Sequence, residues 1–367
     1  MLNRALAALR NQAAQSQSQI KIVKALRFYG KSDLRVEDVS APKHCGSQQV
    51  VVKVKCCGIC GTDLHEYVAG PIFMSDQQIL GHEFSGVVVE VGSEVVQYRS
   101  GDRVAIQPKV FAAADHYSIR GLGHLSEQQG FVGIHHWPWG GMGEYAVLNE
   151  VNLAKLPDSV SDEQGALVEP AAVALYALDN SGLKAGDTIL VSGAGPIGAL
   201  TVLCAHVAGA VQIFVSEPNP KRREFIESLG LSAGVFDPVA DLVPERIRER
   251  VPHGVDVAIE CVGNEKSLST CLKSIRRHGT IVQVGLPTAE CKVDLQLLVL
   301  RDATLRGSLC YPVYSWPRVI GLISRGILPV ERIVTGRIDL NGAVREGFDL
   351  LIAPGTERLK ILVQPSS

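Results

Sequence analysis

Three kinds of metal-binding side chain occur in the first half of the chain. Cys60 precedes His82 and Glu83, and Glu169 follows in an apolar run. Zinc accepts thiolate, imidazole and carboxylate ligands, and a catalytic zinc site keeps one position open for water or substrate. Each of these residues alone is more often structural than metal-binding. Their combination predicts Cys60, His82 and Glu169 as zinc ligands, Glu83 as an exchanging ligand or an outer partner, and Asp63 as the group that orients the His82 imidazole.

A glycine-rich turn of the pattern G-x-G-x-x-G lies further along the chain. It follows an apolar strand pattern and opens a helical one, which is the context that a dinucleotide fingerprint requires. Its glycines permit a tight turn, close approach of the backbone to a pyrophosphate, and close helix–strand packing, while the helix N-terminus faces the phosphates. The predicted cofactor-binding residues of this turn are Gly193, Gly195, Pro196, Ile197 and Gly198.

An acidic residue, Glu217, lies 22 residues beyond Gly195 at the end of the next predicted strand. Its carboxylate would accept hydrogen bonds from ribose hydroxyls and repel a 2′-phosphate, which favours NAD over NADP. Lys221 and Arg222 leave NADP open, because either could bind a phosphate. A metal site followed by a dinucleotide site indicates an enzyme that polarises an alcohol oxygen and passes a hydride to a nicotinamide.

The elements that must position these residues fall into two patterns. Residues 50–56 alternate between apolar and polar side chains, and 86–91 and 103–106 form further strand patterns, so residues 22–149 are predicted to be mostly β. From about residue 162 the chain alternates between strands and helices: 165–178 (helix), 188–192 (strand), 197–208 (helix), 211–216 (strand), 220–229 (helix), 255–260 (strand), 265–277 (helix), 280–284 (strand) and 304–309 (strand). This alternation predicts a doubly wound parallel sheet. The strand pattern at 358–363 has no local partner, and we expect it to rejoin the first domain.

Composition excludes several classes of protein. The chain of 367 residues is long enough for about two domains. Its net charge of −2 gives no reason to expect nucleic acid or an anionic membrane as a partner. Residues 188–215 are uncharged, but their glycines and proline favour a strand, a turn and a buried helix over a membrane span. The nine cysteines are irregularly spaced and no secretory signal is present, so we expect a reducing compartment without disulfides.

The N-terminal segment is unusual in charge. The first 32 residues contain no acidic side chain, and Arg4 and Arg10 accompany leucines that share one helical face. Residues 1–19 are therefore compatible with a mitochondrial transit peptide, or else with a disordered extension or an early start codon. We expect a cytoplasmic protein, with mitochondrial targeting as the alternative.

Taken together, the motifs resemble those of the zinc-dependent medium-chain dehydrogenase/reductase family, over nearly the whole chain after residue 23. The resemblance rests on 58–65 (GICGTDLH), 81–86 (GHEFSG), 101–104 (GDRV), 168–170 (VEP) and the glycine fingerprint. Within the family, 65–67, 130–133 and 165–170 look most like the butanediol dehydrogenase branch. The resemblance implies an α/β protein: an N-terminal extension (1–20), a GroES-like β-rich catalytic domain (21–173 and 311–367) and a Rossmann NAD-binding domain (174–310). It also implies a homo-oligomer, either a dimer or a tetramer.

The resemblance further implies NAD-dependent oxidation of a small secondary alcohol or vicinal diol, of the butanediol/acetoin type, at one catalytic zinc. We expect Thr62 to take the hydroxyl proton and to pass it through the cofactor ribose to His65, which releases it to solvent. The residues expected to position the nicotinamide through backbone contacts are Val262, Val284, Gly285 and Ser308.

Two departures from the family pattern bear on metal content and substrate. Many relatives hold a structural zinc with four cysteines, but residues 107–131 contain none, so we expect no second zinc. A solvated loop is the preferred interpretation of the remaining donors there, namely Asp115, His116, His124 and Glu127. Cys310 stands where sorbitol-type relatives carry an arginine, which weakens a polyol substrate.

Several alternatives stay open at this point. The substrate could be a polyol of the sorbitol or xylitol type, or threonine, and a non-catalytic nucleotide-binding protein is the alternative of another class. The residues 135–139, which include His135, His136, Trp137 and Trp139, either cap a small substrate or simply cover the core.

Overall fold

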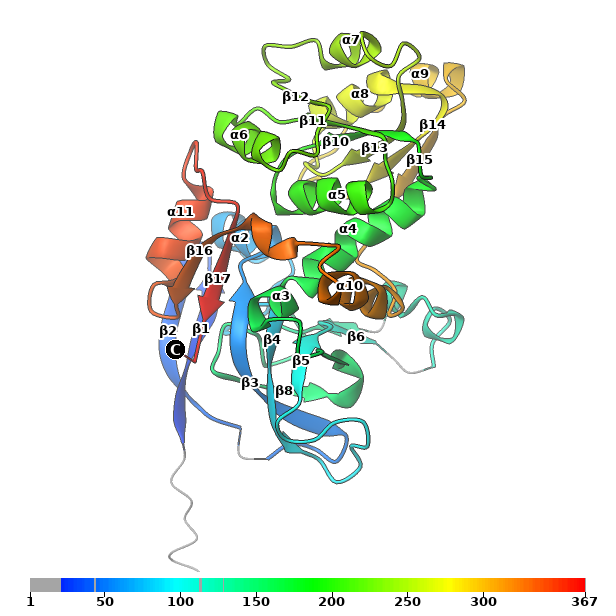
Figure 1. Cartoon of the computed structure of the whole chain (residues 1–367). Coiled ribbons are helices and arrows are strands. Elements are labelled where there is room, and N and C mark those ends of the chain that lie inside the picture. Colours follow the sequence, from blue (N-terminus) through cyan, green and yellow to red (C-terminus); the bar gives the residue numbers. More distant parts are fainter. Residues whose placement is uncertain (1–20, 43, 112–113, 128, 367) are drawn as a thin grey trace, which may run out of the picture.

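The structure, a computed structural model, describes residues 21–42, 44–111, 114–127 and 129–366. The expected N-terminal extension and its possible targeting segment lie outside these residues. The chain forms two lobes, one built on a mixed sheet and one on a parallel sheet, with the long helix α4 (Val168–Ser181) running between them (Figure 1). This arrangement confirms the predicted α/β class with a β-rich domain and a doubly wound domain.

The first lobe contains a seven-stranded sheet in which β16, β17, β3, β4, β5 and β9 follow one another, and β8 pairs with β3. The strands are β3 (Gln49–Gly58), β4 (Glu83–Val91), β5 (Arg103–Ile106), β8 (Tyr145–Asn149), β9 (Leu153–Lys155), β16 (Val334–Asp339) and β17 (Lys360–Gln364). The alternation predicted for β3 is real, because Val50, Val52 and Val54 are fully buried. The helix α2 (Gly61–Ala69) follows β3 directly.

Smaller elements complete this lobe. Its strand pairs are β1 (Ile22–Gly30) with β2 (Asp33–Ser40), and β6 (Lys109–Phe111) with β7 (Gln129–Phe131). Its short helices are η1 (Ser118–Arg120), η2 (Gly123–Leu125), η3 (Glu150–Asn152), α3 (Asp162–Ala166), η5 (Ala343–Phe348) and α11 (Asp349–Ile352).

The last strand joins the first domain, as expected. β17 lies between β16 and β3, with Leu362 opposite Gly58 and Val363 opposite Cys57. The last strand therefore packs beside the strand that leads to Cys60, one of the predicted metal ligands (Figure 1). The exact domain boundaries stay predictions.

The second lobe is a six-stranded parallel sheet in the order β12, β11, β10, β13, β14, β15. Its strands are β10 (Thr188–Ser192), β11 (Gln212–Ser216), β12 (Gly234–Phe236), β13 (Val255–Glu260), β14 (Ile275–Gln283) and β15 (Thr304–Gly307). Its helices are α5 (Pro196–Val207), α6 (Pro220–Ser228), α7 (Val243–Arg248), α8 (Glu265–Ser274) and α9 (Leu295–Leu300). The order reverses after β10, which places a nucleotide crevice at the carboxyl ends of β10 and β13.

Some predicted boundaries were wrong. The apolar run expected as one helix at 165–178 is split into α3 and α4, and Leu167 separates them. The helix expected to reach residue 277 ends at Ser274, because Ile275 is already extended and pairs with Val255 in the sheet.

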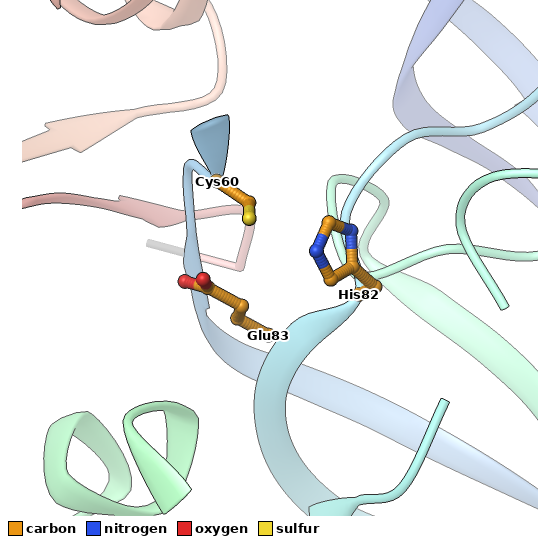
Figure 2. Close-up of side chains that lie close together, drawn as sticks. All are labelled: Cys60, His82 and Glu83. Atoms are coloured by element: carbon orange, nitrogen blue, oxygen red, sulfur yellow. The ribbon is translucent and has the colours of Figure 1, made fainter. Parts of the chain in front are cut away.

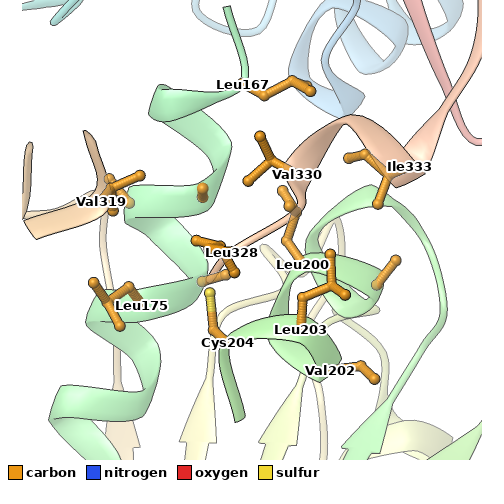
Figure 3. Packing of buried hydrophobic residues seen from close by; sticks show 14 of the residues in the cluster. Leu167, Leu175, Leu200, Val202, Leu203, Cys204, Val319, Leu328, Val330 and Ile333 are labelled. Atoms are coloured by element: carbon orange, nitrogen blue, oxygen red, sulfur yellow. The ribbon is translucent and has the colours of Figure 1, made fainter. Parts of the chain in front are cut away.

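A shared core attaches the last part of the chain to the second lobe. Helix α10 (Ser315–Ser324) and the turn η4 (Val330–Ile333) pack on α4 and α5. Leu175, Leu203, Val319 and Leu328 interdigitate there (Figure 3). Among the described residues, no helix has both the length and the apolar surface needed to cross a bilayer.

Candidate active site

The structure brings Cys60, His82 and Glu83 together. Cys60 is the residue before α2, His82 precedes β4 and Glu83 begins it. β3 and β4 are antiparallel neighbours with Gly58 opposite Glu83, so the two strand ends carry all three side chains to one place. One sulfur, one nitrogen and one oxygen ligand atom lie within 4.8 Å of one another. Figure 2 shows the three side chains around a common space.

The Glu83 carboxylate is held on one side by a residue that the motif analysis missed. Lys360 Nζ, at the start of β17, donates to Glu83 Oε2 at 2.6 Å and to the Ile59 carbonyl at 2.9 Å. Both charged side chains are 1% exposed. A Cβ on Gly58 would lie 2.2 Å from Glu83 Oε2, so only glycine leaves room for this carboxylate. A lysine at the start of an apolar strand was the available sequence signal for Lys360.

The expected contact between Asp63 and His82 is close but is not a hydrogen bond. Asp63 Oδ1 lies 3.7 Å from His82 Nδ1, and neither atom has a hydrogen-bond partner in the described part of the chain. The other carboxylate oxygen, Asp63 Oδ2, accepts from the Cys60 backbone N–H at 2.9 Å. Asp63 therefore caps α2 and fixes the backbone that carries Cys60, which limits how far it can approach the imidazole.

Glu169, near the start of α4, lies outside the group of three converging ligand atoms. Its carboxylate accepts a hydrogen bond from the Tyr311 hydroxyl at 2.7 Å, in a fully buried contact. Burial raises the pKa of Glu169 to about 7, although the charge of His82 and the Tyr311 hydrogen bond oppose the rise. Tyr311 is a second residue that the sequence motifs did not identify as part of the site.

The electrostatics and the donor set fit a divalent cation. Burial lowers the pKa of His82, but the neighbouring Cys60 and Asp63 outweigh it and raise the value to about 10. The site thus attracts positive charge, and a metal ion would compete with the proton on the imidazole. His82 Nδ1 and Glu83 Oε1 are buried, and neither has a hydrogen-bond partner among the residues that the structure describes. Thiolate, imidazole and carboxylate are the ligands that zinc prefers.

Thr62 and His65 lie on one side of α2, three residues apart. Thr62 Oγ1 is 3.8 Å from Cys60 Sγ and is half-buried, whereas His65 is exposed. The pair therefore spans the distance from the metal-ligand residues to solvent.

The glycine turn and Glu217, which are the residues expected to begin the nucleotide site, lie in contact. A Cβ on Gly198 would lie 1.9 Å from the Gly193 carbonyl oxygen, so the close packing of α5 on β10 requires glycine there. Glu217 follows β11 and is buried, and its carboxylate accepts from the Ala194 and Asn219 backbone N–H groups at 2.7 and 2.9 Å. The Arg222 guanidinium reaches the turn beside Gly195, and its Nε has no partner.

The residues expected at the nicotinamide lie at the carboxyl ends of β13, β14 and β15. Backbone N–H groups of Val262 and Gly263 donate to the buried Glu260 carboxylate, which shapes the loop after β13. Gly285 packs against this loop, because a Cβ there would lie 2.2 Å from the Gly263 nitrogen. Ser308 Oγ accepts from Asn180 of α4 at 3.0 Å. Val284 packs beside the second lobe's core.

The donors considered for a second metal do not converge. Asp115 accepts hydrogen bonds from Ser118 and Ser126, and His124 stacks edge-on against Tyr176. Within the described parts of the chain, no second set of three ligand atoms comes together. Trp137 and Trp139 pack against the core of the first lobe. The nine cysteines, all of which the structure describes, are free.

Comparison with known proteins agrees with this geometry. A family model described as zinc-binding dehydrogenase matches residues 196–325, and one described as alcohol dehydrogenase GroES-like domain matches residues 46–158. (R,R)-butanediol dehydrogenase of Bacillus subtilis is 40% identical over 94% of this chain and 100% of its own. The crystal structure of 2R,3R-butanediol dehydrogenase from the same organism matches with a TM-score of 0.87 and 39% identity, over 94% of this chain and 100% of that one.

A second solved structure bears on the nucleotide. It is that of a zinc-binding dehydrogenase from Sinorhizobium meliloti 1021 bound to NADP, which is 31% identical with a TM-score of 0.87 and covers 94% of this chain and 100% of its own. The chain belongs to the zinc-binding dehydrogenase family with a GroES-like alcohol dehydrogenase domain. It is an oxidoreductase, a zinc-type alcohol or diol dehydrogenase.

Proposed function

We propose that this protein interconverts a small vicinal diol and the corresponding hydroxyketone, of the butanediol/acetoin type, with NAD. The observation that carries the proposal is the convergence of Cys60, His82 and Glu83 on a fold shared with butanediol dehydrogenase at 40% identity. These three residues would hold one zinc ion, and Glu169 would offer a further carboxylate if it left Tyr311. Zinc supplies a Lewis acid that lowers the pKa of an alcohol oxygen, and NAD supplies the hydride acceptor.

The protein residues supply positioning and proton transfer. We propose that Thr62 accepts the substrate hydroxyl proton and that His65, exposed one turn later on α2, delivers it to solvent. Thr62→Ala should keep the zinc and lower kcat for alcohol oxidation about 100-fold, whereas Thr62→Ser should retain most activity. Equal activity of Thr62→Ala and the wild type would remove Thr62 from the relay.

Glu217 supports NAD as the cofactor, because a buried carboxylate at the end of β11 disfavours a 2′-phosphate. Arg222 favours NADP instead, because its guanidinium lies at the glycine turn and could bind a phosphate. Fluorescence titration with NADH and NADPH decides between them, and tighter binding of NADPH would overturn the assignment. The zinc content expected is one ion per chain, measured by atomic emission.

The test of function is an assay of NADH formation at alkaline pH with butanediol stereoisomers, sorbitol, xylitol, threonine and ethanol, with and without a zinc chelator. Chelator-sensitive turnover of a butanediol isomer well above the other alcohols is expected. A preference for sorbitol or xylitol would contradict the diol assignment.

Cys60→Ser should lose zinc and activity but still bind NADH, and normal turnover of this variant would refute the metal assignment.

We also propose a homo-oligomer formed through the edge of the second sheet. All four residues of the edge strand β15 are exposed, and α9 beside it exposes further apolar side chains. The exposed apolar residues are Leu295, Val299, Leu300, Leu305 and Leu309. Leu305→Lys should yield monomers in sedimentation velocity. Val96→Lys, at a residue that is 88% exposed in the other lobe, is the control and should not change the mass.

A cytoplasmic location is proposed on the nine free cysteines, which suit a reducing compartment.

A further inference from the structure

A buried lysine close to the metal-ligand residues has no role in the chemistry described so far. Lys109, at the start of β6, is 8% exposed. No hydrogen bond or ion pair joins its ammonium to any residue that the structure describes. A cation that is largely withdrawn from water without a paired charge is costly, and burial lowers the pKa of Lys109. Such a group calls for a partner that the protein itself does not supply.

The ammonium lies close to His82, with the Phe131 ring between them. Its nitrogen is 5.7 Å from the centre of the Phe131 ring, and that ring stacks edge-on against His82 at 5.6 Å. Phe131 is thus a common neighbour of the lysine and a metal-ligand residue. Cys310, after β15, is within electrostatic range of Lys109, and also of Cys60 and Glu169. Residues of β6, β7 and the segment after β15 therefore surround one region next to the metal-ligand cluster.

Other polar atoms in this region are also without partners. Both ring nitrogens of His124 are buried and have no hydrogen-bond partner among the described residues, and the same is true of His135 Nδ1. Burial, and then the charge of Lys109, lower the pKa of His124 to about 4, so its imidazole is neutral at pH 7 and keeps one acceptor and one donor. Burial and the same lysine also lower the pKa of His135. A purely apolar ligand would leave all of these groups unsatisfied.

We propose that Lys109 determines substrate specificity by donating a hydrogen bond to a second oxygen of the substrate, on the carbon next to the one that is oxidised or reduced. An ammonium has three donors and no acceptor, so it selects an acceptor oxygen. A substrate with one oxygen leaves the ammonium unpaired, whereas a hydroxyketone or a diol satisfies it. The inference rests on the proposed function and names the residue that separates vicinally oxygenated substrates from simple alcohols.

The test compares two ketones that differ by one hydroxyl, acetoin and butan-2-one, reduced with NADH by the zinc-loaded enzyme. Lys109→Met should lower kcat/KM for acetoin about 10- to 100-fold, mostly through KM, because a hydrogen bond to a charged group is lost. Butan-2-one should change by less than about threefold on the same argument. Lys109→Arg should recover part of the acetoin activity. Lys31→Met, at an exposed lysine, is the control.

The outcomes separate the two proposals. Equal losses for both ketones would show that Lys109 acts on the site as a whole and would overturn the inference, while leaving the dehydrogenase function in place. Wild-type enzyme that reduces neither ketone would refute the proposed function itself. Pyruvate extends the panel: if Lys109→Met loses pyruvate reduction more than acetoin reduction, the second oxygen belongs to a carboxylate, and Lys109 remains its donor. Lys109→Gln repeats the comparison if Lys109→Met does not fold.

Discussion

At the scale of single residues, the metal-ligand cluster depends on a neighbour that is distant in sequence. Glu83 has one carboxylate oxygen on Lys360, and its other oxygen has no hydrogen-bond partner among the described residues. The lysine orients the carboxylate and balances its charge in a site that excludes water. A metal ion bound there would face a carboxylate that is already partly neutralised.

Removing Lys360 should therefore lower the free energy of unfolding, although Lys360 lies far from Glu83 in the sequence. Lys360→Met leaves the Glu83 carboxylate buried without its partner, and we expect a loss of about 3–5 kcal/mol in the free energy of unfolding. The double variant Lys360→Met/Glu83→Gln should recover most of it, because the buried charge is gone. Urea unfolding of the single and the double variant measures these changes in the free energy of unfolding. A loss below about 1 kcal/mol in the single variant would contradict the argument.

His124 gives the fold a predictable response to acid. Its pKa is lowered from 6.5 to about 4 in the folded protein, so the unfolded chain binds the extra proton first as pH falls. Stability should be fully present above about pH 6.5 and should decline toward pH 4, by roughly 3 kcal/mol from this group. His124→Gln should flatten urea-unfolding stability across that window. His253→Gln, at an exposed histidine, is the control and should retain the wild-type slope.

At the scale of elements, the junction of β10 and α5 carries the glycine turn that we propose binds the nucleotide. The helix packs so closely on the strand that the Gly193 carbonyl occupies the space of a Cβ at residue 198. The turn between them is thus set by backbone contact rather than by side chains.

Gly198→Ala should push the helix away from the strand. We expect a loss of about 1–3 kcal/mol in stability and weaker binding of NADH by at least tenfold, because the turn that approaches the pyrophosphate is displaced. Fluorescence titration and urea unfolding report the two effects. Gly321→Ala in α10 is the matched control: no atom lies within 4 Å of its Cβ position, and alanine there should be neutral or stabilising by up to about 1 kcal/mol. Similar effects of both substitutions would contradict the steric explanation.

At the scale of the whole molecule, the chain closes its first sheet with its last strand. β17 lies between β16 and β3 and supplies Lys360 to the metal-ligand site. The catalytic lobe is thus complete only when the C-terminus is in place.

Deleting residues 359–367 should therefore disrupt the first lobe, although the deletion removes none of the predicted metal-binding residues. We expect early proteolysis within residues 21–150 and loss of bound zinc, since β3 loses its neighbour and Glu83 its partner. Limited proteolysis and metal analysis test this. The control deletes only residues 365–367, which follow β17, and should behave like the full chain.

Much of the fold and part of the site could be predicted from local patterns. The strands around Val52 and the strand–turn–helix at Gly193 were readable because period-two alternation and glycine spacing are local properties. The pairing of Glu83 with Lys360 and of Glu169 with Tyr311 was not, because these partners are 277 and 142 residues apart. Nothing in a linear motif encodes which carboxylate lies closest to Cys60 and His82.

The sequence by itself determined the class of chemistry: a thiolate, an imidazole and carboxylates before a dinucleotide turn, on a β-rich domain followed by a doubly wound one. Only the tertiary structure decided which side chains converge, and that Glu83 and not Glu169 joins Cys60 and His82 in the group of three. It also decided that Lys109 is buried with no hydrogen bond or ion pair to its ammonium from the residues that the structure describes. The physical reason is that residue type sets what a group can bind. The packing of distant strands sets where its charge lies and which partner satisfies it.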